Sequence, residues 1–328
     1  MTEFNVKIEA IEYYLGEIQE SGSDLKKDNP DWRIDDIEEK TGISTRWISS
    51  KNTTAVDLAC KACEKIFKKI NRDSIDTLIF VTQSQDYFLP SSSCVIQDRV
   101  SLGTTTKCFD LNLGCSGFIY ALSMASAYIN SGLGKKILIV CADTYSKYID
   151  KNDRTNRPIF SDAASATVVT ISNNHTVGPF DFGTDGSGYE KLIIKNGASR
   201  SGFLKNNKAP KLYMDGSSVF MFTMSTVPES MNKLLEEHKI DKDKIDLYVF
   251  HQASRIVLKN LQRVLNIPDS KMYINLSKTG NTVSSSIPIA LKNADNQSII
   301  SNNNLIALSG FGVGLSWGSC LLTWNKLL

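Results

Sequence analysis

The chain has 328 residues, of which 41% are hydrophobic and 22% are charged, and its formal net charge is +2. This length predicts one large domain or two fused ones with a substantial buried core. So small a net charge gives no reason to expect nucleic acid or a membrane as a partner. The first residues, MTEFNVKIEAIEYYLG, lack a basic start followed by an apolar core, so we expect no secretory signal peptide. Together with seven cysteines, an odd number, this predicts a reducing, cytoplasmic location.

Helices alternate with apolar strands along the first half of the chain. Periodic apolar positions predict helices at 35–42 and 55–70, after Pro90, and at 118–132. Runs rich in Val, Ile and Leu predict the strands 76–84, 135–144 and 164–172, and a further strand and turn at 108–117. Buried strands separated by helices indicate a layered α/β fold.

Two motifs that point to other classes of protein are better explained by core packing. Cys60 and Cys63 form a CxxC inside a predicted helix, but no second pair of cysteines or histidines lies nearby to complete a zinc site. We therefore predict no metal. The uncharged stretch 305–324 is long enough to cross a bilayer. Its central glycines and serines instead predict two buried strands joined by a turn.

The two halves of the chain repeat the same order of elements. Residues 73–84, DSIDTLIFVTQS, align without gaps with 243–254, DKIDLYVFHQAS, and share Asp, Ile, Asp, Phe and Ser. In each half a helix precedes this segment, and a strand, a turn and a helix follow it, in the second half from residue 273. Two apolar strands then end each half. The repeat predicts a duplicated architecture with pseudo-symmetric halves, 1–172 and 173–328.

Cys115 is the candidate nucleophile. It lies in LNLGCSGF, between an apolar strand and an apolar helix, and glycines on both sides permit a tight turn and close approach of a substrate. The positive end of the helix dipole would lower the pKa of a thiol placed there and favour the reactive thiolate. A small buried cysteine in a strand–helix turn fits the same residues equally well, so this turn alone does not establish catalysis.

His251 is the candidate among three histidines. His175 lies in a polar turn and His238 in a charged helix end, where side chains are usually solvated. His251 ends the apolar run IDLYVF and begins HQASRIV, which resembles a helix start. The carboxyl end of a buried strand is where α/β folds place active sites.

Asn281 and the glycines of 310–314 are weaker candidates by themselves. Asn281 fits a helix cap or a turn, but the repeat places its turn opposite that of Cys115 across a pseudo-twofold axis. The segment GFGVG separates two apolar strands and fits an ordinary turn, or a backbone N–H aimed at an oxyanion. A strand follows it, so it is not a dinucleotide-binding motif.

Across nearly its whole length the chain resembles the β-ketoacyl-ACP synthase III family of thiolase-fold condensing enzymes. The separation of 30 residues between His251 and Asn281 also suits that family. Nine motifs occur in the family's order, which makes chance resemblance an unsatisfactory explanation. They are TGI (41–43), Pro90 with IQ (96–97), LGCSGF (113–118), IFSDAASA (159–166), TDGSG (184–188), MDG (214–216), HQAS (251–254), GNT (280–282) and GFGVGLSWG (310–318).

The resemblance implies a duplicated αβαβα fold and a decarboxylative Claisen condensation. It implies that Cys115 accepts an acyl group from acyl-CoA or acyl-ACP, and that His251 and Asn281 stabilise the enolate formed when malonyl-ACP loses CO2. The N–H groups of Cys115 and Val313 would form the oxyanion hole, and Phe311 would pack near the nucleophile. The implied partners are acyl carrier protein, the acyl thioester and a second copy of the chain, with no metal or redox cofactor.

The same resemblance also implies contacts with the substrate. Leu89 matches a position that reaches into the partner subunit's acyl pocket, and Arg154 matches an arginine that sandwiches the adenine of coenzyme A. The aromatic partner of that arginine is replaced here by Asp36. Arg255 matches a second arginine of the family but lies one position closer to His251, which rotates its side chain by about 100° on a helix. These departures suggest a specialised relative that takes its starter from an acyl carrier protein.

Two other functions remain open at this point. The same fold and residues would also serve an acyltransferase that passes the acyl group to an alcohol or amine without condensation. From another class of protein, a non-catalytic scaffold subunit would keep the fold, although retention of all three candidate residues argues against it.

Overall fold

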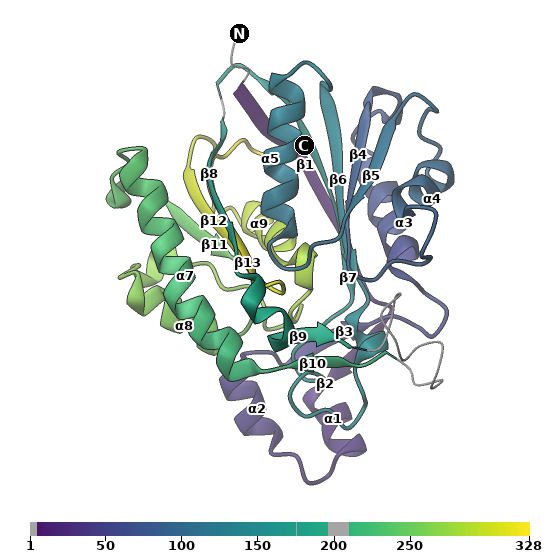
Figure 1. Cartoon of the computed structure of the whole chain (residues 1–328), viewed down its shortest axis with the longest axis vertical. Coiled ribbons are helices and arrows are strands. Elements are labelled where there is room, and N and C mark those ends of the chain that lie inside the picture. The colour runs from purple at the N-terminus through teal and green to yellow at the C-terminus, as the bar shows by residue number, and fades with distance from the viewer. Residues whose placement is uncertain (1–4, 175, 196–209) are drawn as a thin grey trace.

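The apolar segments of the N-terminal half form one sheet of the computed structural model, which describes residues 5–174, 176–195 and 210–328 (Figure 1). β4 (Thr77–Val81) runs parallel to β5 (Lys107–Leu111) and β6 (Lys136–Asp143). β7 (Ala163–Ser172) runs antiparallel to β6 and to β1 (Asn5–Leu15). β4 is buried at every position, as expected for a strand covered on both faces. In spatial order the strands of this sheet are β1, β7, β6, β4 and β5.

The C-terminal half repeats four of these strands in the same order. Its sheet runs β8 (Val177–Thr184), β13 (Ser316–Thr323), β12 (Leu305–Gly312) and β11 (Leu247–Phe250). β11 is parallel to β12, and the other pairs are antiparallel, as in the first sheet. The uncharged stretch 305–324 therefore forms two paired strands, as predicted. His175 lies outside the described residues.

The strand predicted from residue 273 is wrong. Within the described residues, the second sheet has no counterpart of β5, and only an isolated bridge joins Tyr248 to Met272. The side chain of Gln252 explains the difference. It accepts a hydrogen bond from the N–H of Asn275 (2.6 Å) and donates to the carbonyl of Tyr273 (3.4 Å). Backbone groups that would extend a sheet ladder are thus used by a side chain.

Helices separate and cover the two sheets, which confirms the layered αβαβα architecture (Figure 1). α5 packs against strands of both sheets, as does α9, so these two form the central layer. α3 and α4 cover the outer face of the first sheet, and α7 covers that of the second, with α8 packed beside it. The bounds are α3 (Ala55–Ile66), α4 (Ser92–Arg99), α5 (Gly117–Asn130), α7 (Gly216–Glu237), α8 (Arg255–Val264) and α9 (Ser286–Asn296).

Small elements gather at one end of the sheets, at the bottom of Figure 1. An ionic cluster joins three of them, because Arg157 donates to Glu20 and Asp28, both at 2.6 Å, and Arg46 also pairs with Glu20. The elements are β2 (Ile18–Ser21), α1 (Gly22–Asp28), α2 (Ile34–Thr41), β3 (Thr45–Ile48), β9 (Leu192–Ile194) and β10 (Leu212–Met214).

Two observations concern the motifs that suggested other protein classes. Cys60 and Cys63 are buried, unpaired core residues of α3, as predicted. None of the helices in the described ranges combines the length and apolar character that a membrane span requires.

Candidate active site

Cys115 lies in the turn between β5 and α5. Its side chain is 6% exposed. The backbone of β12 approaches it closely, since a Cβ added at Gly312 would come within 3.1 Å of the sulfur. Gly312 has a φ of +154°, which L side chains rarely adopt, so this strand end needs glycine for both reasons. The close approach sets Val313, the next residue, beside the nucleophile.

The prediction that this turn lowers the pKa of the thiol is wrong for the free protein. Burial raises the pKa of Cys115 to about 12, and the carboxylate of Asp143 adds to that rise. α5 begins at Gly117 with Ser116 as its N-cap, so Cys115 lies just before the helix, and burial outweighs the effect of the helix end. The thiol is therefore neutral at rest and must lose its proton as it reacts.

Two backbone N–H groups oppose this rise in pKa, those of Cys115 itself and of Val313. They are the two groups that the resemblance assigned to an oxyanion hole. Val313 is anchored through the following peptide group, because its carbonyl accepts a hydrogen bond from the Ser316 hydroxyl (2.8 Å). The hydroxyls of Ser316 and Ser116 are themselves 2.8 Å apart. Donors fixed in this way can stabilise negative charge on sulfur or on an oxygen beside it.

His251 follows β11 directly, three residues before the Ser254 cap of α8, and not at a helix start as its sequence suggested. The ring is 1% exposed, and its Nδ1 lies 2.7 Å from the Ser286 hydroxyl. It meets the ring of Phe311 edge to face, with centroids 5.5 Å apart. Burial lowers the pKa of His251 to about 3, so the imidazole is neutral at physiological pH.

Asn281 is brought beside the His251 segment by tertiary contacts. Its side-chain oxygen accepts from the N–H of Val283 (2.9 Å), and its amide nitrogen donates to the carbonyl of Ala253 (3.4 Å). The first bond fixes the orientation of the amide, so its nitrogen points toward the residues that follow His251. The two segments that carry the candidate donors His251 and Asn281 are thus joined by a hydrogen bond.

Cys115 belongs to a cluster of buried apolar residues. The buried cluster that contains Cys115 also includes Tyr145, Phe160, Leu192 and Leu212. The Tyr145 hydroxyl donates to the side chain of Gln83 (2.8 Å), which adds one polar pair to this lining. An apolar surrounding excludes water from a reactive thioester and strengthens the interactions of the fixed donors.

Three predicted substrate contacts lie on the surface. Leu89 is 82% exposed, and Arg154 and Arg255 are exposed as well. Arg255 lies over the end of α2, since a Cβ added at Gly42 would come within 2.6 Å of its Cβ. The fourth, Phe311, is buried against His251. The structure thus gathers Cys115, Val313, Phe311, His251 and Asn281, and leaves the other three at the periphery.

Sequence reasoning missed the polar residues that support this site. Ser286 contacts the His251 ring, and Asp143 lies buried near Cys115. The run of serines at 284–286, unusual before an apolar helix, was the only pattern that could have indicated the first of them. No group of three or more His, Cys, Asp or Glu among the described residues could hold a metal ion.

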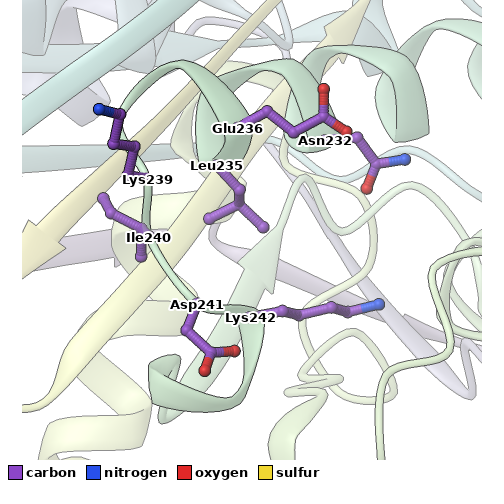
Figure 2. Close-up of a pocket in the computed structure, with 7 residues that line it drawn as sticks. All are labelled: Asn232, Leu235, Glu236, Lys239, Ile240, Asp241 and Lys242. Atoms are coloured by element: carbon purple, nitrogen blue, oxygen red, sulfur yellow. The ribbon is translucent and has the colours of Figure 1, made fainter.

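A surface hollow at the end of α7, shown in Figure 2, is separate from this site. Its lining combines Leu235 and Ile240 with charged residues such as Glu236 and Lys242, and includes none of the candidate catalytic residues. We assign it no role in the chemistry.

Comparisons with known proteins point to one family. Residues 109–186 match the family model for 3-oxoacyl-[acyl-carrier-protein (ACP)] synthase III, and residues 235–324 match that for its C-terminal part. A β-ketoacyl-[acyl-carrier-protein] synthase III from Clostridium novyi is 35% identical, over 98% of this chain and 100% of its own.

Solved structures agree. A 3-oxoacyl-(acyl-carrier-protein) synthase III structure is 36% identical with a TM-score of 0.94, covering 98% of this chain and 100% of that one. A 3-oxoacyl-(acyl carrier protein) synthase from Burkholderia xenovorans is 31% identical with a TM-score of 0.91, covering 98% and 95%.

Proposed function

Since the chain belongs to the β-ketoacyl-[acyl-carrier-protein] synthase III family, we propose that Cys115 accepts an acyl group and that His251 and Asn281 promote its condensation with malonyl-ACP. The protein is a condensing enzyme of the transferase type. Its substrates in this proposal are an acyl thioester and malonyl-ACP, and its product is a β-ketoacyl-ACP.

In the first half-reaction the Cys115 sulfur attacks the carbonyl of the starter thioester. A new carbon–sulfur bond forms, the bond to the carrier breaks, and the carrier thiol leaves with the proton that Cys115 gives up. Because the free thiol has a pKa of about 12, deprotonation has to accompany the attack. The N–H groups of Cys115 and Val313 stabilise the negative charge that develops on the carbonyl oxygen.

In the second half-reaction malonyl-ACP loses CO2, and the electron pair of the broken bond becomes an enolate. The thioester oxygen then carries the charge, and His251 and Asn281 donate hydrogen bonds to it. For His251 this requires the proton on Nε2, which leaves Nδ1 to accept from the Ser286 hydroxyl. That hydroxyl also accepts from the N–H of Gln252 (3.4 Å), which suits it to donate to the ring. The enolate carbon attacks acyl-Cys115 and releases the thiolate.

The observation that supports this function best is the pair of buried neutral donors, His251 and Asn281, on two segments that a hydrogen bond joins. A plain acyltransferase needs a basic histidine to deprotonate its acceptor, whereas burial holds the pKa of His251 at about 3 and makes it a poor base. The test is incubation with a labelled acyl-CoA or acyl-ACP, followed by malonyl-ACP. We expect label on Cys115 that malonyl-ACP discharges to a β-ketoacyl product. Discharge to an alcohol or amine alone would contradict condensation.

We propose that the starter arrives on acyl carrier protein. At the position where the family resemblance places an aromatic residue against adenine, this chain has Asp36, which pairs with Arg33 at 2.8 Å on the surface of α2. A carboxylate offers adenine no stacking surface and repels the phosphates of coenzyme A. Comparing the rates of Cys115 acylation by the same acyl group on the two carriers tests this preference, and faster acylation from coenzyme A would contradict it.

The low pKa of His251 predicts how decarboxylation depends on pH. Between about pH 4.5 and 6 an ordinary histidine, with a pKa of about 6.5, gains a proton and would change its role. His251, with its pKa lowered to about 3 by burial, stays neutral throughout. We therefore expect the CO2 release rate of pre-acylated enzyme to be flat in this window, where circular dichroism should show the protein folded. Asp143, whose pKa burial raises to about 7, is a second group that titrates nearby. A change that follows a group of pKa near 6 in both wild type and Asp143→Asn would therefore contradict the assignment.

We further propose that the protein is a homodimer in which Leu89 completes the acyl pocket of the other subunit. Tyr87, Phe88 and Leu89 are consecutive apolar residues with 58%, 70% and 82% exposure, which an isolated chain rarely leaves in water. Sedimentation at micromolar concentration should show a dimer. Leu89→Phe should shorten the longest starter accepted, because the larger ring fills part of the pocket.

The control for this prediction is Leu133→Phe, which enlarges another exposed leucine, 59% accessible, in the loop before β6. It should leave the starter profile unchanged. An active monomer, or identical starter profiles for Leu89→Phe and wild type, would contradict the cross-subunit pocket.

A further inference from the structure

Asp143 ends β6 with a fully buried side chain. One carboxylate oxygen accepts from the N–H of Gln83 (2.9 Å) and lies 3.5 Å from the Ser84 hydroxyl. The other accepts from the Ser284 hydroxyl (2.5 Å) and lies 3.4 Å from the Ser284 N–H. The carboxylate thus joins the end of β4, in the half that carries Cys115, to the segment that carries Asn281.

Three consecutive serines of that segment each bond to a different part of the site. Ser284 donates to Asp143, Ser285 donates to the carbonyl of Cys141 in β6 (2.8 Å), and the Ser286 hydroxyl contacts the His251 ring (2.7 Å). The segment therefore lies between Asp143 on one side and His251 on the other. Of the first two bonds, the one to Asp143 is charge-assisted when the carboxyl is ionised, which makes it the stronger anchor there.

We propose that Asp143 is a positioning residue that, through Ser284, fixes Asn281 and His251 against the Cys115 half of the enzyme. This proposal rests on the proposed function of those residues. Asp143 takes no part in bond making. It determines whether the malonyl thioester, bound by Asn281 and His251, forms its enolate within reach of acyl-Cys115.

Asp143 also has an electrostatic effect on the nucleophile. Burial raises the pKa of Asp143 to about 7, against the opposing hydrogen bonds, and its ionised form raises the pKa of Cys115. The other titratable groups that interact with it are acidic, and lie on β6, on the following turn and before β7. They are Cys141, Tyr145, Tyr148 and Asp162. Removing the charge should therefore make Cys115 more reactive at a given pH, whereas loss of packing alone would not.

Replacing Asp143 with asparagine separates its effect on the position of the serine segment from the effect of its charge on Cys115. In Asp143→Asn the amide oxygen can keep the N–H of Gln83, and its NH2 group can donate to a rotated Ser284 hydroxyl. The anchor survives while the charge is lost. In Asp143→Ala both are lost, and the 281–286 segment is released on this side.

The experiment measures Cys115 acylation and CO2 release separately in wild type, Asp143→Asn and Asp143→Ala. We expect Asp143→Ala to keep acylation within a few-fold but to release CO2 about 10- to 100-fold more slowly, since a displacement of about 1 Å can cost about 100-fold. Asp143→Asn should release CO2 faster than Asp143→Ala. At a fixed pH above 7, where Asp143 of the wild type is ionised, acylation of Asp143→Asn should be faster than in wild type.

Asp181→Ala is the matched control. Asp181 is also a buried aspartate, but it accepts from Ser230 (2.6 Å) and Lys233 (2.7 Å) on α7, away from the serine segment. It should lower thermal stability without changing the ratio of the two rates. A fall of both rates by one common factor in Asp143→Ala, as in this control, would overturn the proposal.

Two further measurements keep the test decisive. If Asp143→Ala does not fold, Ser284→Ala removes the same bond from the other partner with a smaller change of volume, and should slow CO2 release selectively. Hydrogen exchange of the 281–286 amides requires no chemistry, and should be faster in either variant than in Asp181→Ala. If wild type never releases CO2, the proposed condensation fails, while unchanged exchange in these variants would overturn the positioning role separately.

Discussion

His251→Ala and Asn281→Ala enzymes should still form acyl-Cys115, but release CO2 from malonyl-ACP on the order of 100- to 1000-fold more slowly than wild type, the usual loss for one oxyanion-type donor. In the proposed mechanism both side chains act on the malonyl oxygen, after Cys115 is already acylated. The first half-reaction depends instead on the N–H groups of Cys115 and Val313, which neither substitution removes. The measurement is labelled CO2 release beside labelled acylation for each protein.

The matched controls are His238→Ala and Asn302→Ala, which remove the same side chains at exposed positions. Both should behave as wild type in both half-reactions. Equal loss of acylation and CO2 release in His251→Ala would instead indicate a general base for acyl transfer. Wild-type protein that acylates readily but never decarboxylates a malonyl thioester would favour the plain acyltransferase.

Cys115→Ser should abolish acyl-enzyme formation, with a loss on the order of 1000-fold or more, as for nucleophiles of other covalent enzymes. A serine hydroxyl is a poorer nucleophile than a thiol and needs a base that this site does not provide, because His251 is neutral and a weak base. The hydroxyl fits the space of the thiol, so thermal unfolding should remain close to that of wild type.

The control for this prediction is Cys94→Ser, since Cys94 is an exposed free thiol. Acyl transfer is a better measurement than alkylation, because iodoacetamide reacts with accessible thiols whereas Cys115 is buried with a raised pKa. Label that remains in Cys115→Ser, or that is lost in Cys94→Ser, would place the acyl group elsewhere.

The sequence by itself determined the layered architecture and its duplication. Strands such as Thr77–Val81 are continuous apolar runs between helices, and that pattern has few solutions other than a sheet covered on both faces. The aligned segments around residues 73 and 243 predicted equivalent strands, which the structure places as β4 and β11 at matching positions in their sheets. Motifs in order along the chain identified the family, because each one constrains the chain locally.

Only the tertiary structure decided the environment of each candidate residue. Whether a thiol at a helix start is acidic depends on how much water reaches it and on charges from other strands. Burial and Asp143 together reverse the expectation for Cys115. The low pKa of His251 likewise results from its complete burial. The anchor from Asp143 to Ser284 joins residues 141 positions apart, and no local pattern encodes a contact over such a distance.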